Sequence, residues 1–125
     1  MLKKVFYTSV LVSDQDRALD FYTNALGLEQ RVENPTPDGP RFLTVGVKGE
    51  DFQLVLWPGT PGQPEPAMGQ SPPSVTIETE DIRKTVEELK SRGVEFVSDV
   101  LEFPWGYVAQ FEDPDGNRLQ IREGR

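Results

Sequence analysis

The 125-residue chain contains no cysteine and no histidine. Zinc sites in proteins are built mainly from cysteine thiolates and histidine imidazoles, so the usual structural and catalytic zinc sites are excluded. A histidine-based triad, a cysteine nucleophile, a redox dithiol and a disulfide are excluded for the same reason. Any chemistry must use carboxylates, hydroxyls, amides, Lys, Arg, Tyr or the backbone.

Basic residues are also scarce, since 13 Lys and Arg stand against 21 Asp and Glu, for a net charge of -8. Nucleic-acid binding depends on a basic surface, so we expect no nucleic-acid partner. No apolar run is long enough to cross a bilayer, and the N-terminal stretch is a poor signal peptide. We therefore expect no membrane partner and a cytoplasmic protein.

The first half of the chain has the pattern of one strand, one helix and three strands. Ser13 and Asp14 are good N-cap residues, apolar residues recur behind them at helical spacing, and Gly27 suits the helix end. The expected strands, rich in β-branched and aromatic residues, are 5–12, 28–32, 41–47 and 51–57.

The second half repeats this plan. A shift of 67 residues places Asp14 on Asp81, which is a second N-cap candidate before a helix that ends at Gly93. Ile82, Val86 and Leu89 form its predicted buried stripe. The expected strands are 74–79, 94–97, 105–112 and 118–122, and the last two are joined by a turn at 113–117. We predict an α+β fold of paired βαβββ modules.

Residues 58–73 separate the halves and hold six of the eleven prolines and three of the eleven glycines. Such a stretch is either a stiff spacer or a binding loop, and the sequence leaves both readings open. We therefore divide one domain, 1–125, into module one (1–57), a linker (58–73) and module two (74–125).

Three sets of residues resemble a known family: 12–28, then Asp81 and Ile82 with 89–94, and the turn at 111–117. They are similar to the vicinal oxygen chelate superfamily, which includes glyoxalase I, extradiol dioxygenases, fosfomycin-resistance enzymes and bleomycin-resistance proteins. The resemblance implies βαβββ modules whose mixed sheets form an open cup with helices outside. It also implies that a second subunit completes or borders the cup, so we expect a homodimer.

In the family's enzymes the cup carries a divalent metal on four side chains, mainly His, Glu and Gln. The resemblance places these positions at Tyr7, Val55, Ser74 and Gln120. Only Gln120 is a plausible ligand, because valine has no donor atom, serine is a poor ligand, and tyrosine binds a metal only as a phenolate. We therefore expect no metal and no cofactor.

Alternation along the strands predicts which side chains face the cup. On the other face we expect core residues, among them Val10, Val12, Phe52, Leu54 and Leu56. Tyr7 and Trp57 are either ligand platforms or packing residues, and Trp105 lies either at a cavity rim or subunit contact or in simple packing. The candidate ligand-binding residues are Tyr7, Ser9, Gln53, Val55, Trp57, Ser74, Thr76, Trp105 and Gln120.

Glu78 is the only carboxylate expected on the inward side of these strands, and burial would raise its pKa and make it a candidate base. Our first hypothesis is a metal-independent protein that binds a small organic molecule, with the acidic surface favouring a cationic one. The second is an enzyme, glyoxalase-like or another lyase or isomerase, that uses Tyr7, Glu78 or Gln120 without a metal or recruits an ion through other residues. A third is a domain that serves mainly as a dimerising partner for another protein.

Overall fold

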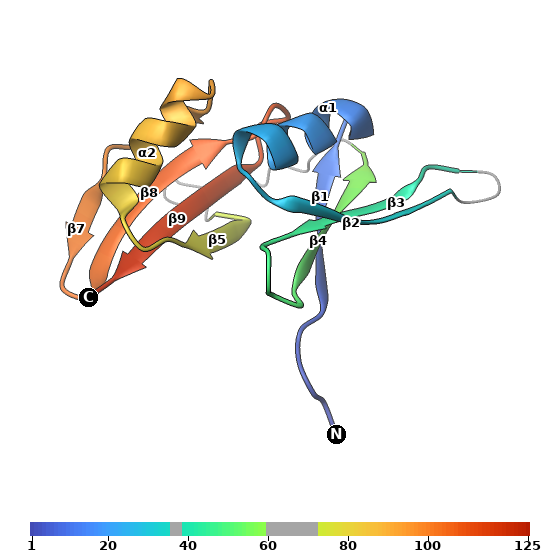
Figure 1. Cartoon of the computed structure of the whole chain (residues 1–125), viewed down its shortest axis with the longest axis horizontal. Coiled ribbons are helices and arrows are strands. Elements are labelled where there is room, and N and C mark those ends of the chain that lie inside the picture. The colour runs from blue at the N-terminus through green and yellow to red at the C-terminus, as the bar shows by residue number, and fades with distance from the viewer. Residues whose placement is uncertain (36–38, 60–72) are drawn as a thin grey trace, which may run out of the picture. The chain divides into compact units, whose positions relative to one another are not determined.

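The computed structural model describes residues 1–35, 39–59 and 73–125. The chain separates into two compact units, Met1–Pro61 and Gly62–Arg125, each with its own sheet and helix (Figure 1). Most of the predicted linker lies outside the described residues, and so does the choice between a spacer and a binding loop.

The first unit holds a four-stranded sheet in the order β1-β4-β3-β2. Its first strand runs parallel to its last, while the other neighbouring pairs are antiparallel. The elements are β1 (Tyr7–Val12), α1 (Gln15–Asp20), a π-helical turn η1 (Phe21–Ala25), β2 (Glu29–Asn34), β3 (Phe42–Gly46) and β4 (Gln53–Pro58).

The helix of the first unit begins where the sequence predicts. The Asp14 carboxylate accepts the backbone N–H groups of Asp16 (2.9 Å) and Arg17 (3.1 Å), which have no partner inside the helix. The final turn is π-helical instead of α-helical, a feature that spacing alone does not reveal. There the Thr23 hydroxyl donates to the carbonyl of Leu19 (2.6 Å), a side-chain bond that competes with the backbone ladder.

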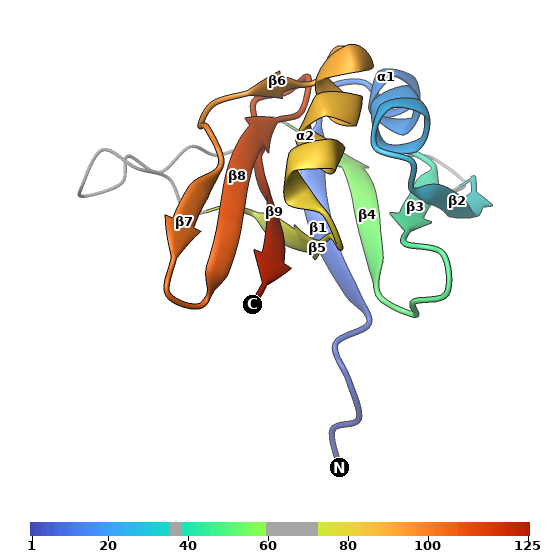
Figure 2. The same ribbon diagram turned by 60° about the vertical axis from the view of Figure 1, so that its left-hand side comes forward.

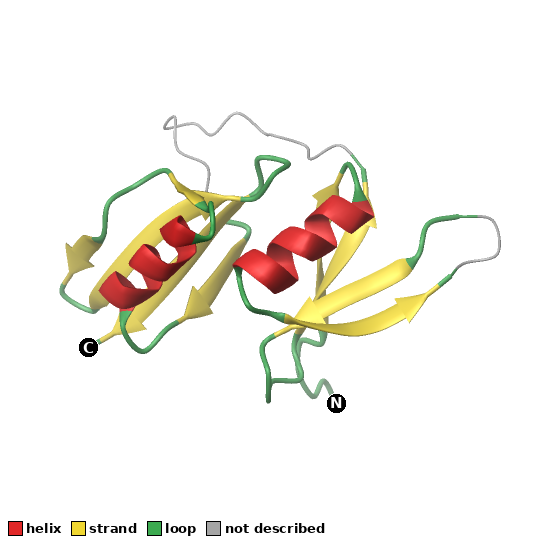
Figure 3. Ribbon diagram, turned by 45° about the horizontal axis from the view of Figure 1, so that its top comes forward, coloured by secondary structure: helices red, strands yellow, loops and turns green. Residues whose placement is uncertain are grey.

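One face of the first sheet packs beneath its helix, which lies across that face in Figure 3. Val12 and Leu56 are fully buried there, and Val10 and Leu54 nearly so, as the alternation predicts. Phe52 does not follow this pattern: it is 37% exposed. It lies before β4 begins at Gln53, so the strand alternation does not reach it.

The second unit holds a five-stranded sheet in the order β5-β9-β8-β6, with β7 paired to the same edge of β8 as β6 (Figure 2). Again the first strand runs parallel to the last. The elements are β5 (Val75–Glu78), α2 (Ile82–Ser91), β6 (Glu95–Phe96), β7 (Leu101–Phe103), β8 (Gly106–Glu112) and β9 (Arg118–Gly124). The sequence did not predict β7, which is only three residues long and is followed by Pro104.

The second helix also begins as predicted, because the Asp81 carboxylate accepts the N–H of Lys84 at 3.2 Å. Ile82, Val86 and Leu89 are buried, as their spacing indicates. The first unit thus has the βαβββ order, and the second follows the same plan with its edge strand divided into β6 and β7. The predicted α+β class of paired modules with open mixed sheets is confirmed. Among the described helices, none has the length and apolar character needed to cross a membrane.

Candidate functional site

Each sheet has a second face, turned away from its helix, and most of the predicted ligand-binding residues of each unit lie on it. In the first unit the parallel register of β1 and β4 places five of them together. Tyr7 pairs with Gln53, Ser9 with Val55, and Leu11 with Trp57. We call these residues the first-unit face: Tyr7, Ser9, Leu11, Gln53, Val55 and Trp57.

Side chains on the first-unit face differ in how far they are available to a ligand. Tyr7 is 46% exposed and Trp57 is half-buried, so both rings keep surface that a ligand could contact. Gln53 and Val55 are buried. The Gln53 amide oxygen accepts a hydrogen bond from the buried Thr44 hydroxyl at 2.6 Å, so this amide helps to join β3 and β4.

Tyr7 also belongs to an aromatic cluster. Its ring meets those of Phe6 and Phe42 edge-on, with centroids 4.7 and 5.7 Å away. Packing and ligand contact, the two readings that the sequence left open for Tyr7, are therefore compatible: one side of the ring packs and the rest stays exposed.

We call the corresponding strand face of the second unit the second-unit face: Thr76 and Glu78 on β5, and Gln120 and Arg122 on β9. Its polar side chains lie in register across these two strands. Thr76 pairs with Gln120, and Glu78 pairs with Arg122. Ser74 lies immediately before β5 and is exposed, and its backbone N–H donates to the carbonyl of Arg118 at 2.7 Å. Three of the four predicted residues of this module, Ser74, Thr76 and Gln120, thus lie along one face.

Gln120 stands at the centre of a hydrogen-bonded row across three strands. Its Nε2 donates to the Thr76 hydroxyl (3.2 Å), and its Oε1 accepts from Nε2 of Gln110 (3.1 Å). Sequence reasoning missed Gln110, although the alternation along β8 sets the half-buried Gln110 and Glu112 apart from the buried Ala109 and Phe111. The sequence did not show that Gln110 pairs in register with Gln120, which is what brings the two amides together.

The sequence predicted a strand from Trp105, but β8 begins at Gly106 and Trp105 lies in the turn between β7 and β8. The indole is 51% exposed. One face of it stacks on Phe103, with ring centroids 5.1 Å apart and planes 2° from parallel, and the guanidinium carbon of Arg122 lies 5.7 Å from its centroid. Phe103 was not identified from the sequence because β7 was not predicted.

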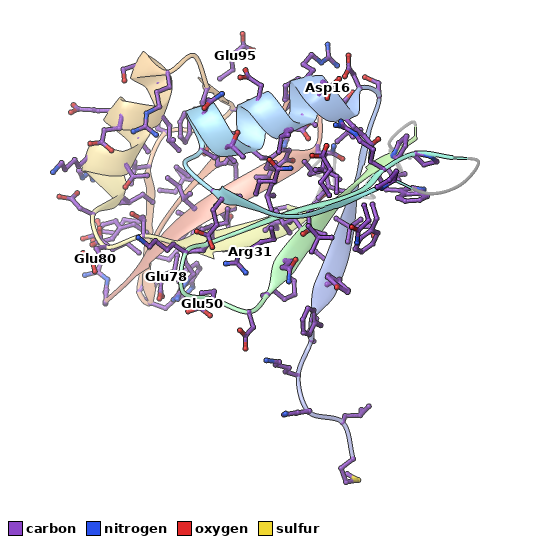
Figure 4. All side chains as sticks on the ribbon, turned by 45° about the vertical axis from the view of Figure 1, so that its right-hand side comes forward. Asp16, Arg31, Glu50, Glu78, Glu80 and Glu95 are labelled. Carbon is purple, nitrogen blue, oxygen red and sulfur yellow. The ribbon has the colours of Figure 1, made fainter. Side chains whose placement is uncertain are left out.

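Glu78 lacks the burial on which its proposed role as a base depended. Its side chain is 72% exposed, and Oε1 lies 3.0 Å from Nη1 of Arg122 (Figure 4). It is therefore one member of a solvent-exposed ion pair.

The four residues to which the resemblance assigns the family's metal are a poor set of ligands for a divalent ion. In the first unit, Tyr7 offers a phenol and Val55 offers no donor atom. In the second, Ser74 offers a hydroxyl, and the Gln120 amide is already bonded at both ends. Within the described part of the chain, no three Asp or Glu side chains cluster closely enough to hold a metal.

Many acidic side chains are exposed, among them Asp16, Glu50, Glu80 and Glu95 (Figure 4). Ion pairs offset part of this charge. A side-chain hydrogen bond to Asp16 raises the pKa of Arg41, and one from Lys4 lowers the pKa of Asp51. With a net charge of -8, the surface field favours the approach of cations.

Each unit combines an open mixed sheet with a helix, and the two units together define an α+β class of paired modules. The chain belongs to the Glyoxalase/Bleomycin resistance protein/Dioxygenase superfamily, whose sequence profile matches residues 4–121. The resemblance inferred from the sequence motifs is thereby confirmed.

Individual relatives span almost the whole chain. TnmS3, an antibiotic binding protein from Streptomyces sp. CB03234, is 34% identical with a TM-score of 0.84, covering 99% of this chain and 98% of that one. The uncharacterized protein YetH of Bacillus subtilis (strain 168) is 32% identical over 98% of this chain and 100% of its own length. A probable lactoylglutathione lyase of Synechocystis sp. (strain PCC 6803) is 25% identical over 94% and 92%.

Proposed function

We propose that this protein binds a small organic molecule on its open strand faces without the help of a metal ion, and that it acts as a homodimer. The observation that best supports this is the state of Gln120. Among the four positions where the family's enzymes hold their metal, it has the most suitable donor atom, yet both ends of its amide are engaged by Gln110 and Thr76. Val55 at another of the positions has no donor atom at all.

The likeness to TnmS3 supports the same proposal, because that protein is an antibiotic binding protein and the match extends over nearly the full length of both chains. The exposed portions of Tyr7 and Trp105 provide aromatic surface, and Thr76 and Gln120 provide polar groups. This combination suits an organic ligand with an apolar body and a few polar substituents.

A thermal-shift screen tests the proposal. Ligands that bind only the folded protein raise the melting temperature, so a panel of antibiotics and aromatic metabolites should contain at least one compound that does so. The Gln120→Leu variant should lose that shift. Lys84→Ala, on the exposed side of α2, is the control and should keep it. The proposal fails if no compound in a broad panel raises the melting temperature of the wild-type protein.

A lyase is the second candidate, supported by the 25% identity to the probable lactoylglutathione lyase of Synechocystis. The assay is formation of lactoylglutathione from methylglyoxal and glutathione, with and without added Ni²⁺ or Zn²⁺. Turnover that depends on added metal, together with a stoichiometric ion after dialysis, would favour this candidate over the metal-free binding protein. Light scattering after size-exclusion chromatography tests the homodimer separately.

A further inference from the structure

Arg122 occupies a position between an aromatic ring and a carboxylate, both on the second unit. Its guanidinium carbon lies 5.7 Å from the centroid of the Trp105 ring, and its Nη1 lies 3.0 Å from Oε1 of Glu78. An aromatic face beside a carboxylate is the arrangement that recognises organic cations. In this structure the cation in that position is the chain's own Arg122 guanidinium.

The backbone beneath Arg122 leaves room for its guanidinium. Gly124, two residues further along the same face of β9, carries no side chain, and a Cβ placed there would lie 3.5 to 3.9 Å from the guanidinium atoms. Its register partner on β8 is Gly106, also without a side chain. The guanidinium therefore lies next to the indole, over the backbone of two glycines, Gly106 and Gly124. A flat cationic group of similar size would fit over the same two glycines.

The contacts that hold Arg122 are weak enough to be exchanged. The side chains of Arg122 and Glu78 are 37% and 72% exposed. Ion pairs and cation–π contacts at such exposed positions contribute little stability, because water competes for both partners. Phe103 stacks on one face of the Trp105 ring at 5.1 Å, so the indole keeps its orientation when Arg122 leaves.

We propose that Trp105 and Glu78 form a binding site for the cationic group of an organic ligand, and that Arg122 is a built-in competitor that must swing away before the ligand binds. The inference rests on the proposed function, since it assigns a ligand class and a regulating residue to the second-unit face. The net charge of -8 favours cations at this surface and disfavours anions.

The test uses three probes of one shape and different charge: benzamidine, benzamide and benzoate. Binding is followed by the NMR signals of the two indole N–H groups, with the Trp105 signal identified by its loss in Trp105→Phe and the Trp57 signal as an internal reference. Arg122→Met, which keeps an apolar chain but removes the competing cation, should tighten benzamidine binding about five- to tenfold. Glu78→Gln should weaken it, and benzamide and benzoate should bind more weakly than benzamidine.

Lys90→Met is the matched control. Lys90 also lies over an aromatic ring of the second unit, with Nζ 5.9 Å from the Phe96 centroid, and its replacement removes the same charge. Because Lys90 lies on α2 and Trp105 in the turn before β8, this variant should leave benzamidine affinity unchanged. Arg122→Gln provides a second neutral variant, and circular dichroism verifies that each variant is folded.

The inference is overturned if Arg122→Met binds benzamidine no more tightly than the wild type, or if neither protein binds it. It is also overturned if benzoate binds best and loses affinity in Arg122→Met, because Arg122 would then be an anchor for anions. These outcomes differ from failure of the proposed function, in which no compound of the thermal-shift panel binds at all. If panel ligands bind but their affinities do not change when Arg122 or Glu78 is replaced, this inference is wrong while the proposed function still holds.

Discussion

Gln110 on β8 donates from Nε2 to Oε1 of Gln120 on β9 at 3.1 Å, and the two residues are also register partners. Because Gln120 donates in turn to Thr76 on β5, this row of side chains joins three strands. It places a rigid polar centre on the second-unit face. The row therefore contributes to the stability of the sheet on the face where we propose that the ligand binds.

Replacing Gln110 with leucine should destabilise the protein by about 1 kcal/mol, because the half-buried oxygen of Gln120 loses this donor. Urea unfolding measures the loss. Gln30→Leu is the control: Gln30 is exposed and its amide bonds only to the nearby Glu33 in the contacts observed, so it should cost less than about 0.5 kcal/mol. Equal losses in the two variants would contradict a special role for the Gln110 row.

Gly106→Ala should destabilise the protein by about 3 kcal/mol or more. Gly106 has φ +148°, and a Cβ there would lie 2.3 Å from the carbonyl oxygen of Glu123, a backbone atom that cannot move aside locally. Gly49 is the comparison, since it has φ +90° but no atom within 4 Å of an added Cβ. Gly49→Ala should cost about 1 kcal/mol, from conformational strain alone. Thermal and urea unfolding of both variants would show no difference if the steric reasoning were wrong.

Asp113→Ala should cost about 1 to 3 kcal/mol, because the buried carboxylate organises the turn between β8 and β9. It accepts the backbone N–H groups of Asp115 (2.9 Å) and Asn117 (2.8 Å), and also the Asn117 side chain (2.8 Å). The exposed Asp99 is the control, and Asp99→Ala should change the free energy of unfolding by less than about 0.5 kcal/mol. A loss for Asp113→Ala as small as that of the control would exclude this role.

The pKa of the Asp51 carboxyl should depend on the nearby Lys4 ammonium. A hydrogen bond from the Lys4 ammonium, with its charge, lowers the pKa of the Asp51 carboxyl below the ordinary value. A carboxyl with a lower pKa when folded contributes stability above its unfolded pKa and loses that contribution as the pH falls through its folded pKa. NMR titration should therefore give Asp51 a lower pKa in the wild type than in Lys4→Met. High salt should narrow the difference because the pair is exposed, and identical titrations in the two proteins would refute the coupling.

Local signals predicted most of the fold. Asp14 and Asp81 both proved to be N-caps, and Gly27 and Gly93 both take positive φ after their helices. Capping and turn formation depend on neighbours a few residues away, so a single sequence reveals them. The burial of Val12 and Leu56 followed from strand alternation for the same reason.

Features that depend on distant partners were not predicted. Strand β7 is too short to have its own pattern and exists through its pairing with β8. Phe52 was predicted to be a core residue of a strand over 51–57, but β4 begins only at Gln53. The hydrogen bond of Gln110 to Gln120 depends on the register that places the two residues opposite each other. The stacking of Phe103 on Trp105 depends on the turn between β7 and β8.

By itself the sequence determined the chemical limits of this protein. The absence of histidine and cysteine excluded common metal and nucleophile chemistry, and the motifs located four family positions whose side chains suit a metal poorly. Only the tertiary structure decided how the remaining groups are paired. Glu78 and Arg122 are 44 residues apart in the chain, and parallel pairing of β5 and β9 makes them neighbours beside Trp105. The chemical groups that a chain offers are known from its residue types. Contacts between distant residues form only when the strands pair in their final register, so the sequence alone did not reveal them.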